Sequence, residues 1–300
     1  MKLFTALFLF ASALAAPLLA ADTYTLVFNR KAEAGQRFGY EGKALIEEDN
    51  NVTLDGAPAR NTRKSATCTL AGEMEIVAVH PSGEPKELLL KVTRSETTED
   101  GQPASLFKAG DKIHLTRGDD HMSAEVQDQA ATPLQTKLLD TLNLVSSSHP
   151  PQDDAIFGPG HPVKAGEEWP VNAAVAAADT QIRKLAEFAE KDIKGTVRCA
   201  GPVQHGGTPC VKTIAELKMS TNKGAVPGVP AQVKIRELTA TMTGEVDLPL
   251  APQAVRPWDT MDMTIKMEAG GDLERDGVKH PIEIRANSRR QYERRLTPLK

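Results

Sequence analysis

The chain has 300 residues, which is about two domains' worth by length, and a formal net charge of −4. Its pI near 6.0 excludes a strongly basic nucleic-acid-binding protein. With 40% hydrophobic and 25% charged residues, it is neither a disordered chain nor a protein with many membrane spans.

The first 21 residues have the three parts of a secretory signal peptide. Lys2 supplies the positive charge, residues 3–14 form an apolar core, and small residues lead to a cleavage site near Ala21. The apolar core is too short to span a membrane comfortably, and Pro17 lies just beyond it. We therefore expect an exported protein, periplasmic or secreted, with no stable membrane span after signal cleavage.

Apolar and polar residues alternate along most of the remaining chain, which predicts half-buried strands. A two-residue turn at Asp276-Gly277 fixes one hairpin register. It pairs Arg275 with Val278, and farther along it sets Glu268 opposite Arg285. Both faces of this hairpin agree in polarity, which is what specifies a register.

Two more hairpins and one irregularity follow from the same pattern. A loop over 81–85 pairs Ile76 with Leu90, and a turn over 118–121 pairs Arg117 with Met122. The alternation changes phase within 231–248, which predicts a bulge near Arg236-Glu237.

Two helices interrupt the strands. Thr132, with Pro at the next position and Gln135 three residues on, forms a capping box that begins the first helix. Asn172 is a favourable N-cap for the second, whose apolar positions recur at helical spacing to Ala189, with Gly195 ending the region.

Together these elements predict a mainly β (α+β) fold, with long curved antiparallel sheets in two similar halves and two packing helices. The first β-rich half covers residues 22–150, and a turn-rich linker covers 151–170. The second half, a helix followed by strands, covers 171–300.

Three cysteines are present. Cys199 and Cys210 flank a loop rich in Gly and Pro, and in an exported chain this arrangement predicts a disulfide that closes a hairpin. Cys68 lies in a predicted strand, where a buried thiol is the expected state.

The linker carries the sequence Pro-Val-Lys-Ala-Gly-Glu-Glu-Trp at 162–169. It resembles the Pro-Val-Lys-x-Gly-Asp/Glu-x-Trp turn of a group of uncharacterised secreted bacterial β-rich proteins. The outline of those proteins is similar to the lipoprotein-carrier half-barrels. The resemblance implies a curved sheet and no particular activity. Trp169 is expected in the core, at the seam between the two halves.

Signatures of catalysis are missing from the sequence. It contains no nucleophile elbow, phosphate loop, zinc-protease motif or dinucleotide fingerprint, so we assign no catalytic residue, cofactor or metal ligand. The densest polar cluster is Asp111, His114 and the turn residues 119–121. The predicted hairpin sends His114 toward Glu125 on the solvent face, which argues against a metal site.

One apolar stripe is a candidate ligand face: Met261, Met263, Ile265 and Met267 alternate with polar residues on one predicted strand. Two helices are too few to cover the apolar face of strands this long. Met side chains are flexible, which suits the wall of a cavity that adapts to its ligand. The sequence therefore favours a non-catalytic envelope protein whose partner is an apolar small molecule or another envelope protein. A structural or assembly role and a hydrolase with a dispersed site are the alternatives.

Overall fold

The computed structural model describes residues 23–118, 122–145, 152–182, 187–224, 232–251, 255–275 and 277–299. Antiparallel strands dominate these residues, as the alternation predicted, with 63% of them in strands and 10% in helices. The strands are β1 (Arg37–Leu54), β2 (Ala57–Val79), β3 (Pro85–Glu99), β4 (Gln102–Pro103), β5 (Lys112–Arg117), β6 (Met122–Val126), β7 (Gln129–Ala130), β8 (Glu168–Pro170), β9 (Ile193–His205), β10 (Thr208–Thr221), β11 (Lys234–Pro249), β12 (Trp258–Arg275) and β13 (Val278–Pro298). The helices are α1 (Pro133–Thr141), α2 (Asp153–Phe157), α3 (Ala173–Ile182) and the short 3₁₀ helix η1 (Glu190–Asp192).

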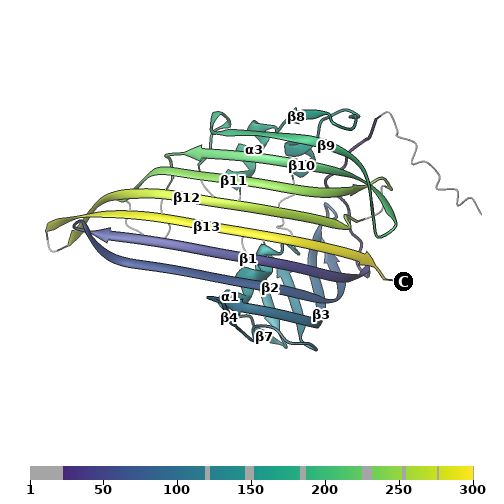
Figure 1. The fold of residues 1–300 in the computed structure, drawn as a ribbon, viewed down its shortest axis with the longest axis horizontal. Coiled ribbons are helices and arrows are strands. Elements are labelled where there is room, and N and C mark those ends of the chain that lie inside the picture. The colour runs from purple at the N-terminus through teal and green to yellow at the C-terminus, as the bar shows by residue number, and fades with distance from the viewer. Residues whose placement is uncertain are drawn as a thin grey trace, which may run out of the picture.

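The two predicted halves share one sheet. Its strand order is β7-β6-β5-β3-β2-β1-β13-β12-β11-β10-β9-β8, with β4 pairing only with β3 (Figure 1). The N-terminal strands form one meander and the C-terminal strands form another. They join where β1 pairs with β13 from Phe38 opposite Pro298 to Leu54 opposite Ile282. Trp169 is buried as expected but lies in β8 at the outer edge of the sheet, so the prediction that it marks the seam is wrong.

Most of the predicted registers are confirmed. β12 and β13 pair Arg275 with Val278 and Glu268 with Arg285, and β5 and β6 pair Arg117 with Met122. The register between β11 and β12 shifts between Ile235 and Glu237, where the bulge was expected.

The register predicted between β2 and β3 is wrong by two residues. Ile76 faces Leu88 instead of Leu90, because the turn closes at His80, whose N–H donates to the carbonyl of Glu84 at 2.9 Å. The ladder irregularities on either side of Ala78 cancel, so Val79 opposite Pro85 keeps the same register as Ile76 opposite Leu88. A shift of two residues keeps every side chain on its predicted face, so the hydrophobic pattern alone could not detect it.

The first helix begins as predicted, and the second is shorter than predicted. Thr132 and Gln135 form the capping box of α1. Asn172 accepts from the N–H of Val175 at 3.2 Å, but α3 ends at Ile182. Residues 183–186 lie outside the described residues, and residues 187–189 are not helical. Gly195 lies in β9, where it pairs with Leu217. The predicted linker also contains the short helix α2.

All three α-helices lie on one side of the sheet, which we call the inner face. Two large clusters of buried side chains fill this side. One lies between α1 and β1–β6 and includes Leu90 and Leu138, both 0% exposed. The other joins α2, α3 and the segment from Tyr24 to Phe28 to β8–β11.

A close contact in the first cluster depends on a glycine. A side chain at Gly42 would collide with the ring of Tyr40 and would press against Leu142, which follows α1. Gly42 therefore allows Tyr40, 1% exposed, to lie flat along its own strand beneath the helix.

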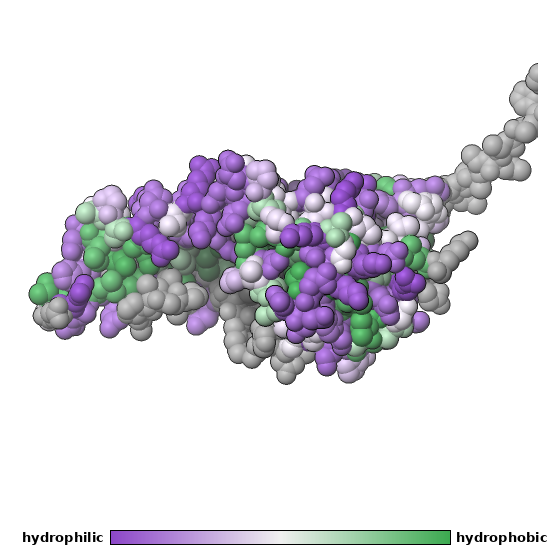
Figure 2. All heavy atoms as spheres, turned by 90° about the horizontal axis from the view of Figure 1, so that it is seen from below, coloured by the Kyte–Doolittle hydropathy of each residue, from purple (hydrophilic) through white to green (hydrophobic). Residues whose placement is uncertain are grey.

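The long strands β1, β2 and β11–β13 extend beyond these covering elements, to the left in Figure 1. We call this extension the distal arm; it comprises the strand residues from about Glu48 to Lys64 and from Ile265 to Ser288, with the start of β11. Its inner face carries a smaller buried cluster of Val233, Ile235, Ala269 and Ile282. Figure 2 shows apolar residues gathered along this end of the molecule.

Candidate functional site

A cavity of about 460 Å³ lies against the inner face, between the sheet, α2, α3 and the loop that follows α1. This volume is within the usual range of small-molecule sites. Apolar side chains from both layers line it, among them Ile156, Ala176, Leu217, Met219, Met242, Met261 and Leu296.

Charged side chains enter the same cavity. Arg30, Arg117, Arg256 and Arg294 line it together with Glu84, Asp153 and Asp179. Arg294 is held by Asp259, whose carboxylate accepts two hydrogen bonds from the guanidinium at 2.9 and 2.7 Å. Burial opposes the charge on Arg294, but Asp259 and Tyr292 outweigh it and raise the pKa of the guanidinium above its ordinary value. The pair with Asp259 holds the Arg294 side chain in place where it lines the cavity.

The predicted methionine stripe continues from this cavity along the inner face. Met261 lines the cavity, whereas Met263, Ile265 and Met267 follow at alternate positions toward the distal arm. All four are half-buried. Within the described part of the chain, Met263 and Ile265 pack into none of the three buried clusters. They therefore lie between the covered part of the inner face and the distal cluster.

The predicted disulfide between Cys199 and Cys210 is not formed: both thiols, and that of Cys68, are free and buried. Cys199 pairs with Thr213, and Cys210 pairs with Val203, because the hairpin closes at Gly206-Gly207 and β9 has one extra residue near Ala200. Cys210 and Thr213 are three residues apart on β10, so Cys210 and Cys199 point to opposite faces of the sheet. Sulfur atoms so placed cannot be joined without moving the backbone.

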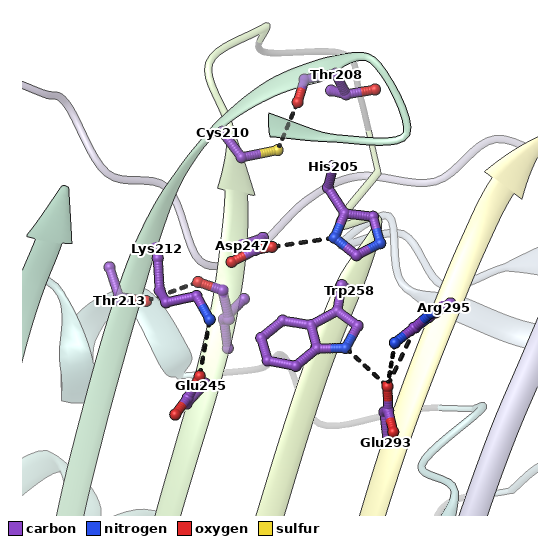
Figure 3. Close-up of polar contacts among 11 residues, drawn as sticks. His205, Thr208, Cys210, Lys212, Thr213, Glu245, Asp247, Trp258, Glu293 and Arg295 are labelled. Atoms are coloured by element: carbon purple, nitrogen blue, oxygen red, sulfur yellow. Dashed lines mark hydrogen bonds and ion pairs between the residues drawn. The ribbon is translucent and has the colours of Figure 1, made fainter. Parts of the chain in front are cut away.

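The opposite face of the sheet, which we call the outer face, has a polar cluster where β9, β11 and β13 end and β10 and β12 begin (Figure 3). Nδ1 of His205 lies 3.2 Å from a carboxylate oxygen of Asp247. The His205 ring stacks on Trp258 at 6.2 Å, and the ammonium of Lys212 lies 4.4 Å from the Trp258 ring centre. Lys212 also pairs with Glu245 at 2.9 Å. The side chains thus pair across neighbouring strands, but Oδ1 of Asp247 is buried and has no hydrogen-bond partner among the described residues.

Cys210 lies beside this cluster, close to His205 and Asp247 (Figure 3). In some enzymes a Cys, a His and an Asp act together as a nucleophile, its base and the group that orients the base. The Cys210 thiol, however, donates to the carbonyl of Thr208 at 3.5 Å. Burial, followed by the charge of Asp247, raises the pKa of Cys210 to about 11. The thiol therefore stays protonated near neutral pH, and the cluster has no activated nucleophile.

The structure does not bring Asp111 and His114, two members of the densest polar cluster of the sequence, to a common site. His114 contacts Glu87 at 2.7 Å and lies 3.9 Å from Glu125, its predicted neighbour. Asp111 instead accepts from the N–H of Lys108 at 2.8 Å, and residues 119–121 lie outside the described residues. No group of three His, Cys, Asp or Glu side chains in the described ranges is arranged to hold a metal ion.

Sequence reasoning missed the arginines of the inner face. Arg290 and Arg294 alternate with Tyr292, and the hairpin register places Tyr292 opposite Met261 and Arg290 opposite Met263, on the apolar face. Charged residues at apolar-face positions of the predicted hairpin were the available signal.

Comparisons with known proteins leave the family open. No protein-family model matches the chain, and no curated protein matches it. Among solved structures, a lipovitellin is 8% identical, with a TM-score of 0.32 over 89% of this chain, which spans 25% of that chain. The outer membrane protein OprG of Pseudomonas aeruginosa is 8% identical, with a TM-score of 0.17 over 89% of this chain and 99% of that one.

The Salmonella secretin InvG is 7% identical, with a TM-score of 0.17 over 90% of this chain and 66% of that one. Scores this low do not support an inference about function. No helix in the described ranges has the length and apolar character needed to cross a membrane.

Proposed function

We propose that the protein is a non-catalytic envelope protein that binds an apolar ligand, or the apolar part of a larger one, on the inner face of its sheet. The supporting observation is the continuity of the cavity with the half-buried side chains of Met261, Met263, Ile265 and Met267. Its place of action, in the periplasm or outside the cell, follows from the predicted signal peptide.

The cavity favours this proposal over an assembly protein with a filled interior. Protein interiors are close-packed, and voids larger than a water molecule are few. A space of about 460 Å³ that adjoins half-exposed methionines is therefore a feature to be explained. Burial of an apolar ligand along the stripe stabilises the complex by about 25 cal/mol per Å² removed from water.

The direct test is saturable binding of a neutral, environment-sensitive dye, Nile red, to the purified full chain. We expect Met263→Glu to abolish saturation, because it places a carboxylate in the middle of the apolar stripe. The fold should tolerate the change, since the cross-strand neighbour of Met263 is Arg290. The matched control is Thr264→Glu on the outer face of the same strand, beside Arg289, and it should bind the dye as the wild type does.

Two outcomes would contradict the proposal. One is a wild-type protein that does not bind Nile red saturably. The other is unfolding by both Met263→Glu and the milder Met263→Gln, which would make Met263 part of a closed core. Near-ultraviolet circular dichroism and the melting temperature separate unfolding from loss of binding.

A further inference from the structure

On the inner face, among the described residues, Arg117 and Arg290 share one carboxylate, that of Asp140. Arg117, at the end of β5, donates to a carboxylate oxygen of Asp140 at 3.0 Å and to the carbonyl of Val145 at 3.3 Å. Arg290, in β13, approaches the other oxygen of Asp140 at 3.7 Å. One carboxylate at the end of α1 thus serves two guanidinium groups, while the adjacent Lys137 and Glu48 pair with each other.

Both arginines retain an unused donor. The Nε atoms of Arg117 and Arg290 are buried, and neither has a hydrogen-bond partner in the part of the chain that the structure describes. Buried donors in folded proteins are nearly always satisfied, and a guanidinium cannot lose its proton to avoid the cost. A cationic group with a free donor fits a planar or tetrahedral anion, such as a carboxylate or a phosphate.

The position of the pair relates this charge to the apolar stripe. Arg117 lines the cavity. Arg290 pairs with Met263 on β12 and with Ile46 on β1, so its side chain starts directly beside the stripe on the same face. Positive charge therefore lies at one side of an apolar surface that continues through Ile265 and Met267 toward the distal arm.

We propose that the ligand is an anionic amphiphile, whose carboxylate or phosphate head group binds Arg117 and Arg290 and whose apolar chain lies along Met263, Ile265 and Met267. This inference rests on the proposed function, and it adds the charge of the ligand and its direction on the sheet. Phosphate and carboxylate share the required chemistry, and the head group and the chain make separate contributions.

Three ligands with the same chain and different heads test the charge: dodecanoate, dodecanol and dodecyltrimethylammonium. Each is titrated below its micelle concentration at about pH 8, where the carboxylate is ionised. We expect dodecanoate to bind about tenfold more tightly than dodecanol, which corresponds to about 1.4 kcal/mol, and the cation to bind most weakly. Acetate and inorganic phosphate, which lack the chain, should not displace dodecanoate at concentrations where dodecanoate saturates.

Arg290→Gln and Arg117→Gln should each lower the ratio of dodecanoate to dodecanol affinity toward one, while dodecanol affinity is kept. Taking the ratio within one variant cancels any change in its stability. The control is Arg285→Gln on the outer face of the same strand, where the side chain is 71% exposed and only 3.8 Å from Glu268. It should leave the ratio unchanged.

The outcomes separate the two proposals. If dodecanol binds and dodecanoate binds no more tightly, the proposal of an anionic head group is wrong. The same holds if neither arginine variant alters the ratio of the two affinities. In both cases the proposal of an apolar binding site is kept. If acetate or phosphate alone displaces dodecanoate, the arginines form an anion site without an amphiphile. If none of the three ligands binds, the proposed function itself fails.

Discussion

The covered part of the inner face and the distal arm differ in how far their apolar side chains are buried. Beneath α1, side chains such as Leu90 are 0% exposed, because α1 and the residues that follow it pack against them. In the distal arm no helix of the described residues covers the same long strands, and Ile265 and Met267 stay half-buried. A sheet with one apolar face must cover it or bind something with it. The difference between the regions therefore indicates where a ligand has room.

The largest expected contrast concerns ion pairs in the two regions. Asp259 is 3% exposed and pairs with Arg294 at 2.7 Å beneath the loop that follows α1. Asp259→Ala should lower the free energy of unfolding by about 3–5 kcal/mol, because it leaves Arg294 buried without its partner. Glu268→Ala in the distal arm removes a pair that is 57% and 71% exposed, and should cost at most about 1 kcal/mol.

Urea unfolding of both variants beside the wild type measures this contrast, with equal m-values as the check that each unfolds in one step. Equal losses in the two variants would mean that the arm is as tightly packed as the covered region. The half-buried stripe would then be ordinary core.

The sheet could be predicted from the sequence because its signals are local. Asp276-Gly277 permits few turn conformations, and the alternation on both sides fixes the pairing of Glu268 with Arg285. Where the turn is longer, as between His80 and Glu84, the pattern determines the face of each residue but leaves a two-residue uncertainty in register.

The candidate site was less predictable because it depends on contacts between distant segments. The stripe of Met261 to Met267 was visible as alternation, but the pairing of Arg117 and Arg290 through Asp140 joins three separate elements. The prediction of the disulfide between Cys199 and Cys210 was wrong for a related reason. Proximity along a hairpin does not determine the face of each cysteine, and one extra residue in β9 changes it.

A smaller, pH-dependent effect should come from the outer face of β12, on the side opposite the stripe. Arg289 donates to both carboxylate oxygens of Asp262 at 3.2 and 2.8 Å, and Gln291 donates at 2.6 Å. The hydrogen bonds from Arg289, with that from Gln291, outweigh burial and lower the pKa of Asp262. Its contribution to stability is therefore present above the unfolded pKa of about 3.9 and is lost as the pH falls through the lower folded value.

We expect Asp262→Asn to cost at most about 1 kcal/mol at neutral pH, since the side chain is 35% exposed. The difference from the wild type should vanish in acid, below the folded pKa. Urea unfolding of both proteins from neutral pH to about pH 2 measures it. A difference that persists or grows in acid would assign the effect to lost packing instead of lost charge.

The last prediction uses the thiols to separate the two regions without altering their stability. Cys68, Cys199 and Cys210 are all buried outside the distal arm. Burial raises the pKa of Cys68 to about 12, raises that of Cys199, and with Asp247 raises that of Cys210 to about 11. Alkylation requires the thiolate, so the native protein should resist iodoacetamide near pH 8, as measured by intact mass.

Opening of the distal arm alone should expose none of these thiols. Labelling should therefore remain absent at urea concentrations where amide exchange in the arm has already become fast. In full denaturant without reductant, all three cysteines should react. If only one reacts, two are joined by a bond in solution. If peptide mapping then identifies Cys199 and Cys210, the β9–β10 register must differ from the one described, because the present register sends them to opposite faces.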